Sequence, residues 1–105
     1  MADKDKAPAY QWYPKDYDTD ETVKLMTYEQ EGVYRRLLDH QWLEGSIPAD
    51  PTQIAGLVPK MARARFLKLW SGISVKFKPV GGGRLANGRL ERQRRDFDEF
   101  VTEQS

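Results

Sequence analysis

The stretch DPTQIAGLVPKMARARFLKLW, residues 50–70, contains two helix signals separated by a tight turn. Asp50 is a favourable N-cap residue, Pro51 suits the first turn of a helix, and Gln53 would complete a capping box. The Gly-Leu-Val-Pro segment ends this first helix after about two turns, and Pro59 restarts the chain. Residues 50–70 therefore predict a pair of helices in close succession.

The second helix of the pair is predicted over Lys60–Trp70. Its apolar positions follow the helical period and form one stripe: Ala62, Phe66, Leu69 and Trp70. Its outward and boundary positions carry four cations and no acid: Lys60, Arg63, Arg65 and Lys68. A helix that required only solubility would usually mix charges of both signs. The pattern favours contact with DNA, and a solvated basic face is the alternative.

A longer helix precedes the pair. Thr27 and Gln30 have the spacing of a capping box, and Gly45 marks the C-terminal end. The residues expected on its buried side are Val33, Tyr34, Leu37, Leu38, Gln41 and Trp42. Ile47, in the Ser-Ile-Pro segment that follows, is expected to point inward from a strand fragment.

A hairpin and a last helix are predicted after the pair. In SVKFK, residues 74–78, Val75 and Phe77 alternate with lysines, which indicates a strand with one buried face. Pro79 favours an edge strand, three glycines form the turn, and Leu85 points inward from the returning strand. The last helix is predicted over Gly88–Ser105, with apolar residues Leu90, Phe97, Phe100 and Val101.

These elements predict an α+β, mainly α fold: a winged helix-turn-helix with a β-hairpin wing and a C-terminal helix. We expect the winged-helix domain to cover residues 23–105 and an N-terminal arm to cover residues 1–22. The arm begins with a charged, frayed segment at residues 1–7. The aromatic residues of YQWYPKDY, residues 10–17, are expected to pack on the core, with Pro14 preventing a regular helix.

The two halves of the chain carry opposite charge. Residues 1–50 contain six Lys or Arg and eleven Asp or Glu, a net charge of −5, whereas residues 51–105 carry +6. Eleven bases and one acid, Glu91, lie between Pro51 and Arg95. This block predicts a surface for a polyanion, with double-stranded DNA as the expected partner. The predicted DNA-binding residues are Lys60, Arg63, Arg65, Lys68, Lys76, Lys78, Arg84, Arg89, Arg92 and Arg95.

Other function classes find little support. The 105 residues contain no cysteine and one histidine, His40. Thiolate metal clusters therefore lack ligands, and His-based metal sites and triads lack partner residues. The acids of residues 16–21 lack the glycine and terminal glutamate of an EF-hand, and GGGRLANG lacks the Lys-Ser/Thr ending of a P-loop. No apolar run approaches the length of a membrane span. We therefore expect a cytoplasmic protein that is not an enzyme and has no metal, no cofactor and no membrane partner.

The sequence also resembles a known family, the YdaU-like proteins of phages and prophages. The resemblance rests on PAYQWYPKDY, on LMTYEQEGVYRRLLDHQWLEGSIPADPTQIAGL and on NGRLERQ, and covers residues 8–99. It implies a winged helix similar to the N-terminal domains of replication initiators, DNA binding and no established catalytic motif. The expected function is double-stranded DNA binding linked to replication or its regulation. The alternative is a protein-interaction module that forms a homodimer or docks on phage or host replication proteins.

Overall fold

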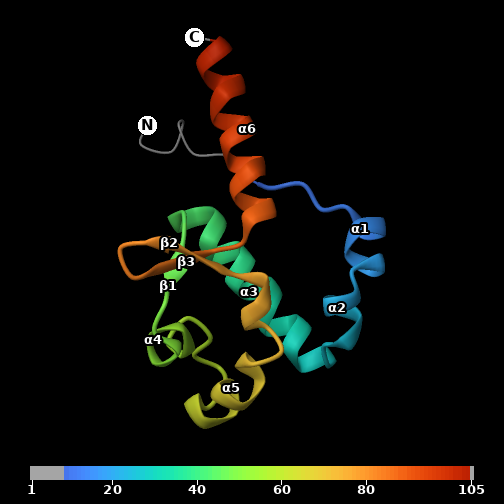
Figure 1. The fold of residues 1–105 in the computed structure, drawn as a ribbon, viewed down its shortest axis with the longest axis vertical. Coiled ribbons are helices and arrows are strands. Elements are labelled where there is room, and N and C mark those ends of the chain that lie inside the picture. Colours follow the sequence, from blue (N-terminus) through green and yellow to red (C-terminus); the bar gives the residue numbers. More distant parts are fainter. Residues whose placement is uncertain (1–8, 105) are drawn as a thin grey trace.

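The computed structural model describes residues 9–104 of the chain and is mainly helical (Figure 1). The elements are α1 (Pro14–Thr19), α2 (Glu21–Leu25), α3 (Tyr28–Glu44), β1 (Ile47–Pro48), α4 (Pro51–Ala55), α5 (Arg63–Trp70), a 3₁₀ helix (Ser74–Lys76), β2 (Lys78–Gly81), β3 (Arg84–Ala86) and α6 (Gly88–Gln104). The predicted last helix thus forms over Gly88–Gln104, and residues 1–7 and Ser105 lie outside the described part.

A small antiparallel sheet joins the hairpin to the strand fragment. Its order is β1-β3-β2, with Ile47 opposite Leu85 and Lys78 opposite Ala86. Helix α3, strand β1, the pair α4 and α5, and the β2–β3 hairpin follow one another as in a winged helix. The predicted α+β, mainly α fold class is therefore confirmed. The position of β2 at the sheet edge, which Pro79 indicates, is also confirmed.

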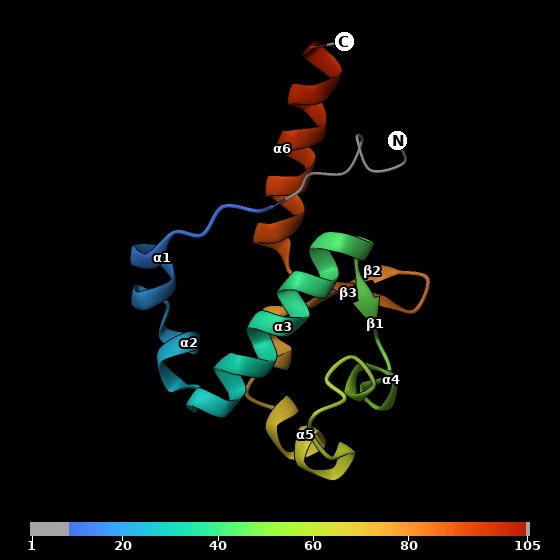
Figure 2. The same ribbon diagram turned by 180° about the vertical axis from the view of Figure 1, so that it is seen from behind.

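Helix α3 lies at the centre of the molecule in both views (Figures 1 and 2). The Thr27 hydroxyl accepts a hydrogen bond from the Gln30 N–H at 3.1 Å, and the Gln30 side chain accepts one from the Thr27 N–H at 2.9 Å. Gly45 ends the helix with a φ of 95°. All six side chains predicted on the inner face are buried. The predicted helix and its orientation are confirmed.

The core forms where α3, α4, α5 and the sheet meet. Its fully buried side chains come from five different segments: Leu37, Ile47, Ile54, Phe66 and Ile73. Each such burial stabilises the fold by roughly 2 kcal/mol. Non-local apolar contact, rather than the intrinsic stability of the short helices, therefore holds α4 and α5 in place.

A buried amide pair ties α3 to the start of α6. Gln41 donates to the Asn87 carbonyl at 3.1 Å and accepts from the Asn87 N–H at 2.7 Å. The Asn87 side chain donates to the Lys76 carbonyl at 2.9 Å and accepts from the Leu90 N–H at 3.1 Å. One asparagine thus caps α6 and fixes its direction relative to α3.

Two details of the predicted helix pair are wrong. Helix α5 begins at Arg63 rather than Lys60, because Ala62 is extended, with a ψ of 142°. The Met61 N–H bonds instead to the carbonyl of the buried Val58 at 3.1 Å, which keeps the preceding residues in a turn. The second wrong detail is the capping box predicted for Asp50 and Gln53. Asp50 caps α4 as predicted, but its carboxylate accepts a hydrogen bond from the Thr52 N–H at 2.9 Å rather than from the Gln53 N–H.

The strand predicted over SVKFK is also wrong. Residues 74–76 form a 3₁₀ helix, and the side chain of Val75 is 66% exposed. Ile73 and Phe77 are the buried residues, so the spacing of the inward positions is four rather than two. The strand begins at Lys78, four residues after the predicted start at Ser74. Ile73 rather than Val75 packs in the core. Core packing therefore outweighs the alternating sequence pattern that favours a strand.

Two of the N-terminal aromatics, Tyr10 and Tyr17, pack on the core, whereas Tyr13 is exposed, and Pro14 does not prevent a helix. Pro14 occupies the first turn of α1. Proline is tolerated there because an N–H at this position would have no partner within the helix. Tyr10 and Tyr17 pack against the core and donate hydrogen bonds to Asp39 and Glu31, each at 2.6 Å. Burial and these carboxylates raise the pKa of both phenols. The proposed boundary between arm and domain after residue 22 remains a prediction.

Candidate nucleic-acid interface

The ten predicted DNA-binding residues divide into two groups. Six have exposed side chains, and these side chains make no hydrogen bond, ion pair or ring contact with another residue of the described part: Lys60, Arg63, Lys68, Lys78, Arg92 and Arg95. The other four are held by partners within the chain: Arg65, Lys76, Arg84 and Arg89. A held cation must break its contact before it can bind a phosphate.

Lys76 is held most firmly and lies outside the hairpin. Its ammonium donates to Asp20 at 2.6 Å, and both side chains are partly buried. Burial alone would raise the pKa of Asp20, but hydrogen bonds from Lys76 and the Val23 N–H outweigh it and lower that pKa. Asp20 also caps α2 through the Val23 N–H. The pair therefore joins α2 to the segment after α5.

Arg84 and Arg89 also turn toward the protein. Arg84 donates to the Ser46 hydroxyl at 2.9 Å and to the Ser46 carbonyl at 3.1 Å. Arg89 pairs with Asp16 of α1 at 3.2 Å and lies over the Tyr13 ring. These contacts fasten β3 to the end of α3, and α6 to α1. Both arginines serve the fold in this conformation.

Arg65 links α5 to the first turn of α3. Its guanidinium donates to both carboxylate oxygens of Glu29, and this contact lowers the pKa of Glu29. Close by, the Gln30 side chain donates to the Leu69 carbonyl at 3.0 Å. Both partners of the ion pair are exposed, so its contribution to stability is small. Its consequence is positional, because it draws one edge of α5 toward α3.

The remaining exposed cations near α5 form a surface that we call the α5–wing surface: Lys60, Arg63, Lys68 and Lys78. Phe66 and Leu69 point into the core, which leaves Lys68 on the outer side of α5. Lys78 follows directly on Phe77, whose ring stacks on that of Trp70 with centroids 6.1 Å apart. This stacking places the start of β2 against the end of α5. No acid lies between Pro51 and Leu90 in the sequence.

The tip of the wing presents backbone rather than charge. Gly81, Gly82 and Gly83 have φ angles of 91°, 63° and 72°, and open space surrounds the position of a Cβ at each. The Ala49 N–H bonds to the Gly83 carbonyl at 2.9 Å, which anchors the tip to β1. Side chains would be strained in this backbone conformation. The turn predicted from the three glycines is confirmed.

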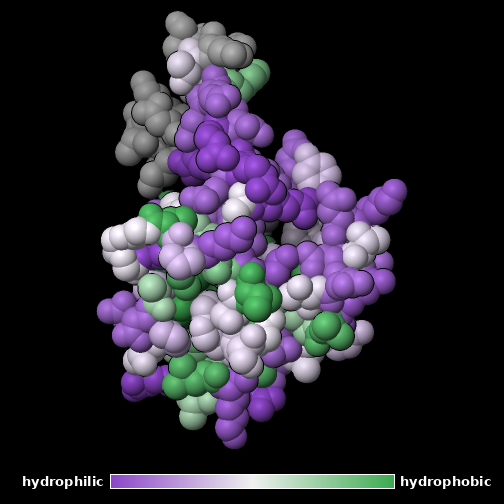
Figure 3. Space-filling model, in the orientation of Figure 1, coloured by the Kyte–Doolittle hydropathy of each residue, from purple (hydrophilic) through white to green (hydrophobic). Residues whose placement is uncertain are grey.

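Arg92 and Arg95 belong to α6 rather than to α5 or the wing. In both views α5 is at one end of the molecule, and α6 projects from the other (Figures 1 and 2). Hydrophilic side chains dominate the projecting helix (Figure 3). The single basic surface predicted from α5, the hairpin and α6 remains a prediction.

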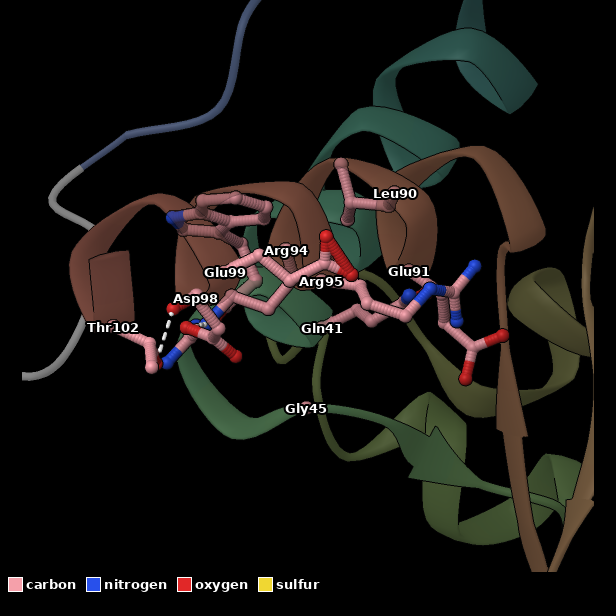
Figure 4. Close-up of a pocket in the computed structure, with 10 residues that line it drawn as sticks. Gln41, Gly45, Leu90, Glu91, Arg94, Arg95, Asp98, Glu99 and Thr102 are labelled. Atoms are coloured by element: carbon pink, nitrogen blue, oxygen red, sulfur yellow. Dashed lines mark hydrogen bonds and ion pairs between the residues drawn. The ribbon is translucent and has the colours of Figure 1, made fainter.

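A hollow of about 600 Å³ lies between the end of α3 and α6 (Figure 4). Arg94 donates to the Trp42 carbonyl at 2.8 Å and lies 3.5 Å from Asp98, in the next turn of α6. Arg95 lines the same hollow, together with Glu91, Asp98 and Glu99. The hollow has cations and acids on its rim, so it lacks the single sign of charge that marks the α5–wing surface.

The fold and its exposed cations define a winged-helix domain with a basic surface on its second paired helix. The family model described as Protein of unknown function (DUF1376) matches residues 8–94, and the chain belongs to this family. Neither a curated protein nor a solved structure matches the chain. Within residues 9–104, no helix is both long and apolar enough to cross a membrane.

Proposed function

We propose that the protein binds double-stranded DNA through the α5–wing surface. The observation that carries the proposal is a set of four exposed cations on and beside α5, whose side chains have no partner in the described part of the chain. They lie in a segment of the sequence without acids. In helix-turn-helix proteins the second helix of the pair enters the major groove. Arg63 and Lys68 would make that approach. Lys60 and Lys78 flank α5 and would neutralise phosphates, which position the protein without specifying sequence.

The resemblance to YdaU-like proteins extends this proposal to a biological setting. The protein would act in the cytoplasm of a bacterial host, in replication of phage or prophage DNA or in its regulation. Support comes from the resemblance in residues 8–99 and from the winged-helix order of α3, β1, α4, α5 and the hairpin. The proposal assigns the protein no enzymatic activity, because it needs only charge and shape.

A salt-titrated binding assay tests the proposal. Fluorescence anisotropy would be measured with labelled random-sequence duplex, single-stranded DNA and duplex RNA, over a series of salt concentrations. We expect the DNA duplex to bind at low salt and its affinity to fall linearly in a double-logarithmic plot. Undetectable binding at low salt, or affinity independent of salt, would refute DNA binding through this surface.

A second candidate function is protein interaction through α6. The last turns of α6 project from the body, and the side chain of Phe100 is 57% exposed (Figures 1 and 2). Val101, predicted to share this apolar end, has a side chain outside the described part. An exposed aromatic residue on a projecting helix is suited to pair with a copy of the chain or a replication protein. Phe100→Ser would abolish such pairing and leave DNA affinity unchanged, as sedimentation and anisotropy would measure.

A further inference from the structure

A small hollow lies beside the first turns of α3, next to the turn that precedes α5. Its volume is about 220 Å³, and Val33, Val58 and Met61 supply apolar lining. This volume is below the roughly 300–1,000 Å³ of typical small-molecule sites. The hollow is therefore suited to a single ring or one side chain rather than to a whole cofactor.

Gly32 opens this hollow, and the fold itself does not require glycine there. The residue lies within α3, its φ is not positive, and no atom of the described residues lies within 4 Å of the position of a Cβ. Glycine inside a helix is destabilising relative to alanine. A side chain at position 32 would narrow the hollow. Space for a ligand explains the glycine, whereas backbone geometry and packing do not.

Tyr28 supplies an aromatic surface at the rim. It is the first residue of α3, and its side chain is 92% exposed although it lines the hollow. A ring this exposed is accessible to a ligand at the rim. Aromatic rings of this kind stack on nucleic-acid bases with little dependence on sequence, because every base has a π-face.

The charge around the rim is positive. Arg36 and Lys60 both line the hollow, are exposed, and have no hydrogen bond or ion pair with any other residue between 9 and 104. Among the described residues that line the hollow, Glu29 is the only acid, and Arg65 neutralises its carboxylate. The complementary ligand is a flat ring with negative charge beside it.

We propose that this hollow receives one unpaired base of a nucleic-acid strand, with Tyr28 against the base and with Arg36 and Lys60 on the flanking phosphates. The choice of nucleic acid among ring-bearing anions rests on the proposed DNA binding. Lys60 belongs both to the hollow and to the α5–wing surface. A duplex bound at α5 would therefore carry a single-stranded end directly past Tyr28, and the preferred ligand is a duplex with an unpaired extension.

The test compares a blunt duplex, the same duplex with a short oligothymidine extension, and the oligothymidine alone, each labelled for anisotropy. Wild type should bind the extended duplex roughly 5- to 150-fold more tightly than the blunt one, the gain expected from one stacked base. Gly32→Gln and Tyr28→Ala should abolish this gain and leave blunt-duplex affinity unchanged. Gly32→Gln should also unfold at a higher urea concentration, so loss of binding could not be attributed to unfolding.

Matched controls lie on the same helix. Arg36→Gln should reduce the gain, whereas Arg35→Gln should not, because the Arg35 guanidinium lies over the Trp12 ring, 4.4 Å from its centroid. Equal affinity of wild type for blunt and extended duplexes would overturn the inference and leave the proposed function standing. If no duplex binds, the proposed function fails. Oligothymidine binding that depends on Gly32 would then still support the hollow as a base site.

One further outcome would overturn the inference. The hollow would also accommodate a hydrophobic side chain of an acidic peptide, because its lining is apolar and its rim is basic. A Phe-containing acidic peptide that binds wild type but not Gly32→Gln, combined with no preference for the extended duplex, would assign the hollow to a protein partner instead.

Discussion

Replacing Arg63 and Lys68 together by glutamine should halve the salt dependence of duplex binding. The α5–wing surface has four unpaired cations, and each neutralised phosphate contributes about −0.9 to the slope of log affinity against log salt. Wild type should therefore show a slope near −3.6, and its affinity should fall by about 150-fold between roughly 50 mM and 200 mM salt. The double variant keeps two cations, so its slope should be near −1.8, and its affinity should fall by only about 12-fold.

Anisotropy with a random-sequence duplex measures both slopes. The matched control is the double variant Arg92→Gln and Arg95→Gln, which removes two exposed cations from α6. Because α6 projects from the end of the molecule opposite α5, this control should keep the wild-type slope (Figure 1). Equal slopes for wild type and the Arg63/Lys68 variant would refute the assignment of the DNA surface. So would an equal loss in the α6 control.

Three further predictions concern the contacts that hold the fold. Lys76→Ala should lower the free energy of unfolding by roughly 1.5 to 3 kcal/mol, the contribution of a hydrogen bond to a charged group. It should leave the salt slope of DNA binding unchanged. Urea titration would measure the first effect and anisotropy the second, and a reduced slope would contradict a purely structural role for Lys76. Gln41→Ala leaves the Asn87 N–H buried without a partner, while the Asn87 carbonyl keeps its bond from the Glu91 N–H. The change should cost about 1 to 3 kcal/mol, so an unchanged urea midpoint would contradict the amide pair. Burial and the charge of Asp20 raise the pKa of Tyr34 to about 12. Its protonated form is therefore favoured in the folded state, and the resulting stability should be complete below about pH 10 and lost between about pH 10 and 12. Tyr34→Phe should weaken this alkaline destabilisation, as urea midpoints over a pH series would measure.

The predictions that hold are those for which local chemistry and burial agree. Thr27, Gln30 and Gly45 carry start and stop signals for α3, and the same segment has an unbroken apolar stripe. The errors occur where local pattern and core packing compete. At Val75 the alternation favours a strand, but Ile73 and Phe77 fill the core and leave Val75 outside.

For the candidate site, the sequence identifies the cations but not their partners. Lys76 and Asp20 are 56 residues apart, and Arg89 and Asp16 are 73 apart. No local spacing rule connects such residues, because their proximity depends on how α1 and α2 fold back. The role of Asn87 is likewise hidden. Its position before Gly88 indicates a turn or a cap, whereas its bonds to Gln41 require α3 to pass beside it.

The sequence by itself determined the order of the main elements from α3 to α6, the winged-helix class and the separation of acidic and basic halves. These properties follow from caps, glycine and proline positions, and periodicity, all of which act over a few residues. Only the tertiary structure decided which cations remain exposed, that α6 points away from α5, and that Gly32 opens a hollow beside Tyr28. Each of these depends on distant segments packing together. Packing brings acids of the N-terminal half against Arg65, Lys76 and Arg89, and leaves the side chains of six predicted DNA-binding cations without a partner among residues 9–104.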